Sequence, residues 1–440
     1  MAVSGGFRLF TNVIKSTCHS TVVRRLNTRA WSTATASAIK QDQKLTINSA
    51  MPMTSQSTKI IFSDNRSCDF KYIWLRDNCV CTQCIHPETR QKLLDSPLIS
   101  ASIKPKSLEV NSDGDLTIDW PENKLGSDDH RSVYGAAWLH KHGLCFAQDT
   151  FDLSEETVHF KEPSVMWDRT AIWKNFPEIS YREVMEKDEG LALYLQMIAR
   201  YGFAIIRDVP TEKDEIIKVV KRFAYVKETS YGITFDVLCA PDPNAHLAYT
   251  GRRLELHTDL NYREKVPGLQ LLHCLRSESL GDTGGKSFFV DGFFVAKWLQ
   301  THQPAAFHIL SSTPLKFSIK NKNLKYSQYW PIICTDKQDE ITEIHYNNRT
   351  MGPVQTPSHL VLPFYHAYRL FSEKLRDPSC ELVFNLVPGD LVAFNNRRVL
   401  HGRTAFDARQ VKRHLQGCYV DIDEAMSTFG HLMSGDQPEQ

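Results

Sequence analysis

Short apolar runs separated by turn residues fill the second half of the chain, and this spacing constrains the fold more than any other feature. The runs cover residues 268–275, 287–290, 341–346, 382–387 and 390–394. Gly284-Gly285 and Pro388-Gly389-Asp390 supply turn signals between them. Such spacing is typical of antiparallel strands. It predicts a β-sandwich or jelly roll buttressed by helices on one face.

Two amphipathic helices precede this region. The first begins at the capping box Ser180-x-x-Glu183 and ends near Gly202. Its apolar face consists of Leu191, Leu195 and Ile198. A buried strand is expected over residues 203–209 and a second helix over 216–223. A further helix is expected to interrupt the strands over 293–309.

The first third of the chain has a different organisation. Residues 59–62 and 108–120 predict short strands in a small β-rich domain that ends near residue 140. Residues from about 40 to 57 are expected to form a polar linker, and residues 141–180 a connector. The sequence therefore predicts three parts, which are a leader over 1–50, a small domain over 58–142 and a jelly-roll domain over 175–430.

The leader has the composition of a targeting segment. Residues 1–41 contain no Asp or Glu but carry six Lys and Arg residues among many Ser and Thr. Phe7, Phe10 and Ile14 fall at helical spacing, which favours a mitochondrial transit peptide over a disordered tail and predicts a location in the matrix. Translation from Met51 or Met53 would give a shorter, cytoplasmic form.

Charge and hydropathy exclude two classes of partner. Lys and Arg number 52 against 51 Asp and Glu, so no nucleic-acid partner is expected. No 18 apolar residues run together, so no membrane span is expected. The 11 cysteines are odd in number and lack the spacing of a disulfide scaffold, which fits a reducing compartment.

Candidate metal ligands occur in the β-rich half. His257 and Asp259 would project to the same face of a strand, because side chains at i and i+2 do so. About one H-x-D triplet is expected by chance among 17 histidines, and its structural alternative is a hydrogen-bonded pair at a strand edge. With His401 as a third ligand, the set matches the two-histidine, one-carboxylate site of non-haem Fe(II) oxygenases. A zinc hydrolase is less favoured, since no companion general base is recognisable.

A keto-acid cosubstrate needs a fixed cation for its distal carboxylate. Arg413, twelve residues after His401 and next to an expected return strand, is the candidate. Arg403 and Arg409 are its competitors, and any of the three can instead be a solvated surface charge.

Taken together, these and other segments of the sequence resemble a known family, the Fe(II)- and 2-oxoglutarate-dependent dioxygenases of carnitine biosynthesis, which act on gamma-butyrobetaine or trimethyllysine. The matching sequence segments occur in the same order as in the family, between about residues 59 and 428. They are residues 74–79, 248–250, 257–259, 268–274, 290–293, 346–348, 400–403 and 417–419.

The resemblance implies a mostly β fold with flanking helices, in which a double-stranded β-helix (jelly-roll) oxygenase core follows a small zinc-binding domain. It implies that His257, Asp259 and His401 hold Fe(II), and that Arg413 and the main chain near Leu272 bind 2-oxoglutarate. The implied reaction is a hydroxylation that consumes O2 and 2-oxoglutarate and releases succinate and CO2, with ascorbate as the reductant. The family also implies a homodimer.

The resemblance also explains a cysteine cluster. Cys79, Cys81 and Cys84 lie within six residues, and the family holds structural Zn(II) through three Cys and one His. The fourth ligand maps to His130. Four protein ligands leave no open position for catalysis, so such a site stabilises a small domain. The alternatives are a set of unliganded thiols, or His86 as the fourth ligand, which would strain a loop that already supplies three.

For the substrate, the resemblance implies an aromatic cage around a trimethylammonium group, because a quaternary ammonium binds best to aromatic faces. The residues that match substrate-binding positions are Tyr231, Phe235, Tyr249, Asn347 and Tyr419. Without the resemblance, each aromatic residue alone is more typical of core packing. Four positions depart from the family pattern, namely Phe235, His246, Leu260 and Arg397, with Tyr262 two residues beyond Leu260.

Three functions follow from these patterns. The favoured one is hydroxylation of gamma-butyrobetaine to L-carnitine, because residues 304–313 and 413–415 are closer to that enzyme. The second is 3-hydroxylation of trimethyllysine, whose extra α-amino group calls for an acidic partner that the sequence does not clearly supply. The third is a zinc-stapled binding protein without turnover, against which the intact metal-ligand set argues.

Overall fold

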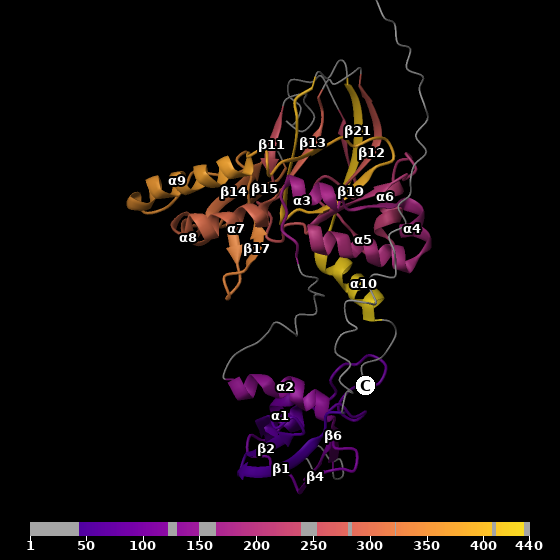
Figure 1. Cartoon of the computed structure of the whole chain (residues 1–440), viewed down its shortest axis with the longest axis vertical. Coiled ribbons are helices and arrows are strands. Elements are labelled where there is room, and N and C mark those ends of the chain that lie inside the picture. Colours follow the sequence, from indigo (N-terminus) through magenta and orange to yellow (C-terminus); the bar gives the residue numbers. More distant parts are fainter. Residues whose placement is uncertain are drawn as a thin grey trace, which may run out of the picture. The chain divides into compact units, whose positions relative to one another are not determined.

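The computed structural model describes residues 44–121, 130–148, 164–238, 253–279, 284–321, 323–406 and 411–434. The chain divides into two compact units, residues 1–155 and 156–440 (Figure 1). Residues 1–43 of the expected leader lie outside the described residues, as do His246, Tyr249 and Arg409.

Unit 1 contains two three-stranded antiparallel sheets with the orders β1-β2-β3 and β4-β5-β6. The strands are β1 Ile47–Thr54, β2 Ser57–Phe62, β3 Ser67–Lys71, β4 Ser107–Val110, β5 Leu116–Trp120 and β6 His130–Tyr134. Its helices are α1 Tyr72–Asp77, η1 Ser96–Leu98 and α2 Ala136–Gln148. Phe62, Phe70, Leu116 and Trp120 are fully buried between the elements and form much of the core. Strand β1 occupies a stretch that the sequence pattern assigns to leader and linker.

Unit 2 is built on two antiparallel-dominated sheets. The larger has the order β10-β21-β12-β19-β8-β7, with β9 beside β21, and the smaller has the order β11-β20-β13-β18. The strands of the larger sheet are β7 Glu178–Ser180, β8 Phe203–Arg207, β9 Val226–Lys227, β10 Phe235–Leu238, β12 Leu269–Ser279, β19 Leu391–Asn395 and β21 Val411–Val420. Those of the smaller sheet are β11 Leu254–His257, β13 Ser287–Asp291, β18 Leu382–Phe384 and β20 Val399–Arg403. These sheets confirm the predicted jelly roll.

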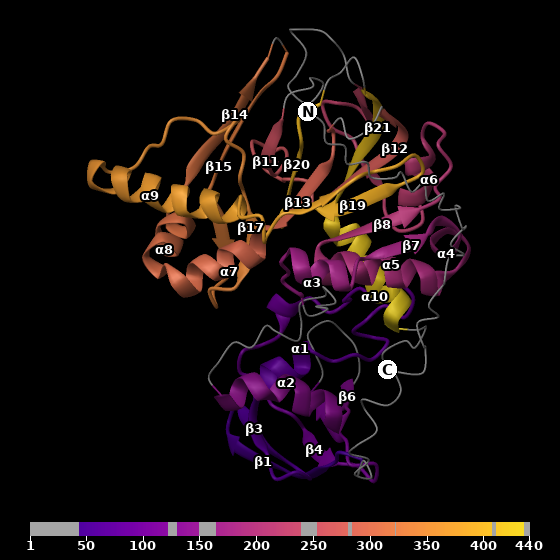
Figure 2. The same ribbon diagram turned by 45° about the horizontal axis from the view of Figure 1, so that its top comes forward.

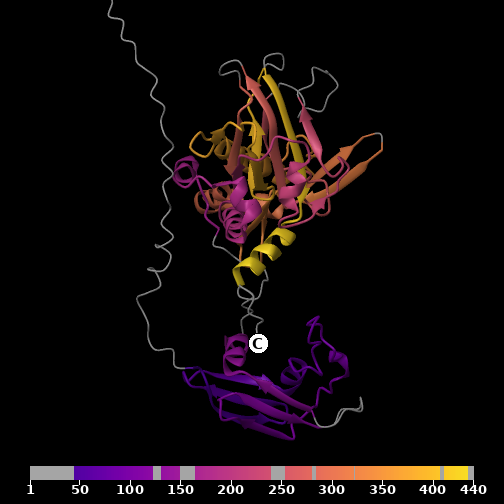
Figure 3. The same ribbon diagram turned by 90° about the vertical axis from the view of Figure 1, so that its right-hand side faces the viewer.

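One group of helices covers the outer face of the larger sheet (Figures 1 and 2). They are α4 Tyr181–Glu186, α5 Asp188–Tyr201, α6 Glu215–Val220 and α10 Ile422–Ser434. Leu191, Leu195 and Ile198 of α5 pack with Leu269 and Leu271 of β12, as their helical spacing predicts. The expected first helix is divided at Lys187, where the backbone is extended. Figure 3 shows that α10 directly continues the path of β21.

A second group of elements packs beside the smaller sheet. Its helices are α7 Gly292–His302, α8 Pro304–Ser312 and α9 Ser358–Leu375. Its strands are β14 Leu315–Lys320, β15 Lys325–Trp330, β16 Ile333–Thr335 and β17 Ile341–Ile344. The β14–β15 hairpin projects from the body of the unit (Figure 3). The remaining helix is α3 Arg169–Lys174.

Local sequence explains how two of these helices end. The Ser180 hydroxyl accepts a hydrogen bond from the Glu183 backbone N–H and so caps α4. Gly202 ends α5 at φ +80°, where a Cβ would meet Val399 and Arg398. In the described part of the chain, no helix combines the length and the apolar composition that a membrane span requires.

Candidate active site and structural metal site

Two groups of metal-ligating side chains occur among the described residues. One consists of His257, Asp259 and His401 in unit 2, and the other of Cys79, Cys81, Cys84 and His130 in unit 1. In each group the candidate ligand atoms lie within 4.8 Å of one another. Both sets were predicted from the sequence, and the structure brings the members of each together.

Neighbouring strands bring the two histidines of unit 2 into contact. β11 and β20 are antiparallel, and His257 lies directly opposite His401 in their register. The centroids of the two imidazole rings are 4.1 Å apart. β11 ends at His257, so Asp259 belongs to the following turn and not to the strand. The turn arises because Leu260 adopts a left-handed φ of +60°.

The Asp259 carboxylate lies between the two rings. Its oxygens are 3.4 Å from Nε2 of His257 and 3.6 Å from Nε2 of His401. These distances are long for hydrogen bonds. Ligand atoms that share one ion at about 2.1 Å stand about 3 to 3.5 Å apart, so the spacing fits a shared metal. The Nδ1–H of His257 donates to the Glu255 carbonyl at 2.8 Å, which directs the Nε2 lone pair toward the carboxylate.

The electrostatics of this group suit a divalent cation. Burial lowers the pKa of His257 to about 4, and the neighbouring His401 adds to the effect, so its imidazole is neutral at neutral pH. Burial alone would raise the pKa of Asp259, but His257 and His401 hold it well below its usual value. Two neutral imidazoles and one ionised carboxylate are the donor set that Fe(II) oxygenases use.

A cavity of about 370 Å³ opens over these three residues and lies between the two sheets. Arg413 of β21 and Leu272 of β12 both line it. Arg413 is 8% exposed, and its Nη2 donates to the Ser287 hydroxyl at 3.4 Å. Its competitor Arg403 also lines the cavity and stacks over the Phe406 ring at 4.5 Å. The cavity therefore combines the candidate metal ligands with a buried guanidinium.

Aromatic rings gather in the same cavity. The centroid of Phe235 is 5.3 Å from that of Tyr419 and 6.4 Å from that of Tyr231. The hydroxyls of Tyr231 and Tyr262 are 3.4 Å apart, which adds Tyr262 to the group. The Tyr419 hydroxyl donates to Asp259 at 3.2 Å and joins the aromatic group to the triad. Three of the four expected aromatic residues thus lie together, and the fourth, Tyr249, lies outside the described residues.

The structure places Asn347 and two of the positions that depart from the family pattern, Leu260 and Arg397. Asn347 lines the cavity and donates to the Thr258 carbonyl at 3.1 Å. Leu260 also lines it, next to Asp259. Arg397 is not among the lining residues, because its guanidinium donates to the Val266 carbonyl and pairs with Glu343 at 3.1 Å.

The sequence patterns missed two residues of this region. Arg349 lines the cavity, and Asn396 contacts the backbone of Asp259. Both belong to connections between secondary-structure elements, where side chains follow no helical or strand period.

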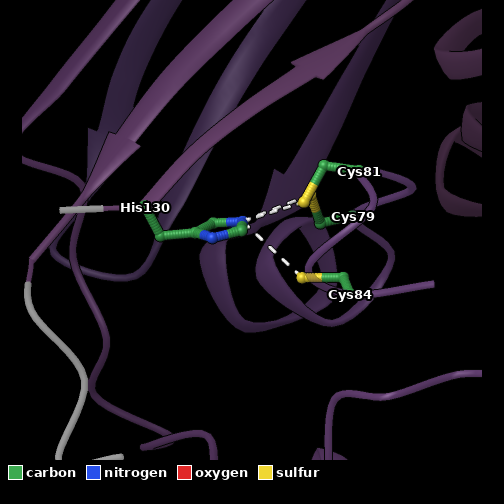
Figure 4. Close-up of side chains that lie close together, drawn as sticks. All are labelled: Cys79, Cys81, Cys84 and His130. Atoms are coloured by element: carbon green, nitrogen blue, oxygen red, sulfur yellow. Dashed lines mark hydrogen bonds between the residues drawn. The ribbon is translucent and has the colours of Figure 1, made fainter. Parts of the chain in front are cut away.

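The four candidate ligands of unit 1 converge on one point (Figure 4). Nε2 of His130 lies 3.3, 3.8 and 3.6 Å from the Sγ atoms of Cys79, Cys81 and Cys84. In a tetrahedral zinc site these edges are about 3.5 Å, so the donor set and its spacing fit Zn(II).

Outer contacts orient this group. Nδ1 of His130 lies 3.1 Å from Oε1 of the Gln83 side chain, which requires a proton on Nδ1 and leaves the Nε2 lone pair facing the sulfurs. Nη1 of Arg76 donates to the Cys84 sulfur at 3.3 Å. His86 is not part of the cluster, because its Nδ1 accepts from the backbone N–H groups of Glu88 and Thr89.

Comparisons with known proteins agree with this geometry. Residues 168–419 match the family model of the taurine catabolism dioxygenase TauD, TfdA family, and residues 49–140 match the gamma-butyrobetaine hydroxylase-like N-terminal model. The jelly roll, the triad and the family together define an Fe(II)- and 2-oxoglutarate-dependent dioxygenase.

Three relatives are similar over most of their length. Gamma-butyrobetaine dioxygenase of Pseudomonas sp. (strain AK-1) is 35% identical over 85% of this chain and 93% of its own. Mitochondrial trimethyllysine dioxygenase of Gallus gallus is 32% identical over 82% of both chains, and gamma-butyrobetaine dioxygenase of Homo sapiens is 30% identical over 84% and 92%. The chain belongs to the family of gamma-butyrobetaine and trimethyllysine dioxygenases.

Proposed function

We propose that this dioxygenase hydroxylates gamma-butyrobetaine to L-carnitine, while 2-oxoglutarate is converted to succinate and CO2. The observation that carries the proposal is the group of aromatic rings in the same cavity as the triad. A trimethylammonium group cannot donate a hydrogen bond, and it binds to aromatic faces by cation–π attraction. The group contains Tyr231, Phe235, Tyr262 and Tyr419.

The residues of the triad would hold the iron. His257, Asp259 and His401 supply three ligands on one side, and bound Fe(II) would activate dioxygen for hydroxylation coupled to decarboxylation of the keto acid. Arg413 would seat the distal carboxylate of 2-oxoglutarate, because a guanidinium pairs with a carboxylate through two parallel hydrogen bonds. Leu272 lines the cavity beside it.

Other residues of this chain position the substrate. The Tyr419 hydroxyl donates to Asp259, so the same ring that would contact the substrate cation also restrains the iron carboxylate. Apolar side chains of both sheets, among them Phe289 and Leu415, line the cavity and would limit the water around the reacting carbon. The chain thereby contributes the orientation of the substrate.

The charges of the cavity favour gamma-butyrobetaine over trimethyllysine. Trimethyllysine carries an α-amino group that calls for an acidic partner. Among the described residues that line the cavity, Asp259 is the sole acidic one, and it is committed to the metal. The relatives carry either name, so 3-hydroxylation of trimethyllysine is the second candidate.

A turnover assay tests the proposal. Purified protein is incubated with Fe(II), ascorbate, 2-oxoglutarate and either substrate, and succinate is measured. We expect release of succinate with gamma-butyrobetaine. Release with trimethyllysine alone would transfer the proposal to the second candidate. If the protein is active on neither substrate although iron is verifiably bound, the result would favour a binding protein that is stabilised by zinc and has no catalytic activity.

We propose also that Cys79, Cys81, Cys84 and His130 hold structural Zn(II).

We propose further that the protein is located in the mitochondrial matrix and forms a homodimer. The leader composition and the mitochondrial relatives support the location. Localisation of the full chain fused to a fluorescent protein, beside a form starting at Met51, tests it. Light scattering coupled to size-exclusion chromatography measures the oligomeric state.

A further inference from the structure

Among the described residues, three arginines line the active-site cavity, and they differ in their surroundings. Arg403 and Arg413 are 4% and 8% exposed and lie on β20 and β21, within the two sheets. Arg349 lies on the connection between β17 and α9 and is exposed. Its guanidinium is therefore accessible to a ligand that enters the cavity.

The backbone around Arg349 is held firmly. Its N–H donates to the side-chain oxygen of Asn347 at 3.1 Å. The following residue, Thr350, accepts a hydrogen bond from the Ser318 N–H of β14 at 2.7 Å, and the Met351 N–H donates to the Asn347 carbonyl at 3.1 Å. These bonds fix the backbone from which the side chain reaches the cavity. Less conformational entropy is therefore lost when a ligand binds.

The guanidinium of Arg349 has a free capacity to bind an anion. No ion pair or side-chain hydrogen bond joins it to any residue in the described part of the chain. Partial burial lowers the pKa of Arg349, while the charge of Asp259 raises it, so the guanidinium lies within electrostatic reach of the triad. The Asp259 carboxylate is committed to His257, His401 and Tyr419 and makes no ion pair with Arg349.

A neighbouring polar candidate is already engaged. The Asn347 carboxamide donates to the Thr258 carbonyl and accepts from the Arg349 N–H. Asn347 is therefore engaged in the turn. Among the described residues that line the cavity, Arg349 is the exposed cationic side chain.

We propose that Arg349 binds the carboxylate of the substrate and selects for trimethylammonium compounds that carry one. The aromatic group of Tyr231, Phe235, Tyr262 and Tyr419 and the guanidinium of Arg349 line one cavity, so it complements both ends of a zwitterion. This inference rests on the proposed function for the aromatic group, but it concerns the opposite end of the substrate.

The test compares gamma-butyrobetaine with its carboxamide analogue, which keeps the cation and the shape but has no negative charge. Binding is measured by calorimetry on the iron- and 2-oxoglutarate-loaded protein without oxygen, and kcat/KM in air. The variant is Arg349→Gln. Its matched control is Arg369→Gln, because Arg369 is an exposed arginine of α9 that lines the adjoining cavity and pairs with Glu373.

We expect the parent protein and Arg369→Gln to bind gamma-butyrobetaine about 30-fold more tightly than the amide, as a charge-assisted pair would give. In Arg349→Gln this preference should fall to about threefold or less. The KM for 2-oxoglutarate should not change. An undiminished preference for the carboxylate in Arg349→Gln would overturn the inference, and so would a rise confined to the KM for 2-oxoglutarate.

The two proposals can fail separately. If the parent protein turns over only trimethyllysine, the proposed substrate is wrong, and the same comparison with trimethyllysine and its carboxamide decides the role of Arg349. If the parent protein binds neither compound in either form, both proposals are overturned. If it turns over gamma-butyrobetaine but does not distinguish the amide, only the inference on Arg349 is wrong.

Discussion

The carboxamide of Asn396 bridges the backbone of Asp259. Its oxygen accepts from the Asp259 N–H at 2.7 Å, and its nitrogen donates to the Asp259 carbonyl at 3.0 Å. Asn396 is fully buried and precedes β20, which carries His401 five residues later. One side chain therefore ties the turn that presents the carboxylate to the strand that presents the second histidine.

Loss of this bridge should weaken metal binding. We expect Asn396→Ala to raise the dissociation constant for Fe(II) about tenfold to 100-fold, because Asp259 loses the contacts that orient it. Metal titration of the apoprotein measures the effect, and circular dichroism reports whether the fold persists. Asn395→Ala is the control, since Asn395 accepts from the Arg397 N–H but does not contact Asp259. Equal iron affinity in both variants would refute the positioning role.

Gly417 makes room for an aromatic ring of the cavity. A Cβ at this position would lie 2.4 Å from the Phe235 ring. Gly417→Ala should displace Phe235 and raise the KM for the trimethylammonium substrate about tenfold, with little change in the KM for 2-oxoglutarate. Steady-state kinetics with each compound varied in turn separates the two constants. Gly135→Ala, where nothing lies within 4 Å of the new Cβ, should behave like the parent.

The distinctive chemistry of a few residues made much of the site predictable. His257, Asp259 and His401 carry donor types and a spacing that few other functions require. The prediction that His257 and Asp259 lie on one face of a strand was partly wrong, because the strand ends at His257 and Asp259 follows it. A left-handed φ at Leu260 carries no sequence signal of the kind that Gly or Asn would give.

The missed elements lack a clear periodic signal. β1 pairs with β2 through its main chain, and Met51 and Met53 are exposed, so its side chains hardly distinguish it from a linker. α9 contains Pro363 and exposes Leu362 at 81%, which blurs its apolar face. By contrast, the capping box at Ser180 correctly predicted where α4 begins.

Asp259 tests the iron proposal most directly. Asp259→Ala should reduce succinate release to background and leave thermal unfolding nearly unchanged, because the cores of the unit do not include this carboxylate. The exposed residue Asp423 of α10 supplies the control, and Asp423→Ala should keep full activity. Turnover by Asp259→Ala at the parental rate would contradict the assignment of the ligands.

The cysteine cluster should stabilise unit 1 through its metal. Cys81→Ser should lower the free energy of unfolding of this unit by about 3 kcal/mol, because binding of structural zinc is coupled to folding. Thermal unfolding and zinc content are measured together. Cys334→Ser, which changes a cysteine outside the cluster, should retain its zinc. Parental melting and full activity in Cys81→Ser would make the structural-zinc proposal wrong.

A buried histidine outside the active site links stability to pH. His273 of β12 is fully buried, and its polar neighbours include the backbone of Val209. Burial lowers its pKa to about 4, although the carboxylates of Glu215 and Asp390 act in the opposite direction. Glu215 pairs with Lys218, and Asp390 pairs with Arg207.

The unfolded chain protonates this histidine near pH 6.5 and the folded chain only near pH 4. Its contribution to stability is therefore complete above pH 6.5 and is lost as the pH falls toward 4, by about 3 kcal/mol in all. Urea unfolding of the parent and of His273→Gln at pH 7, 6 and 5 should give a shallower pH slope for the variant. His431→Gln, at an exposed position of α10, should keep the parental slope. Identical slopes in all three proteins would exclude His273 as the titrating group.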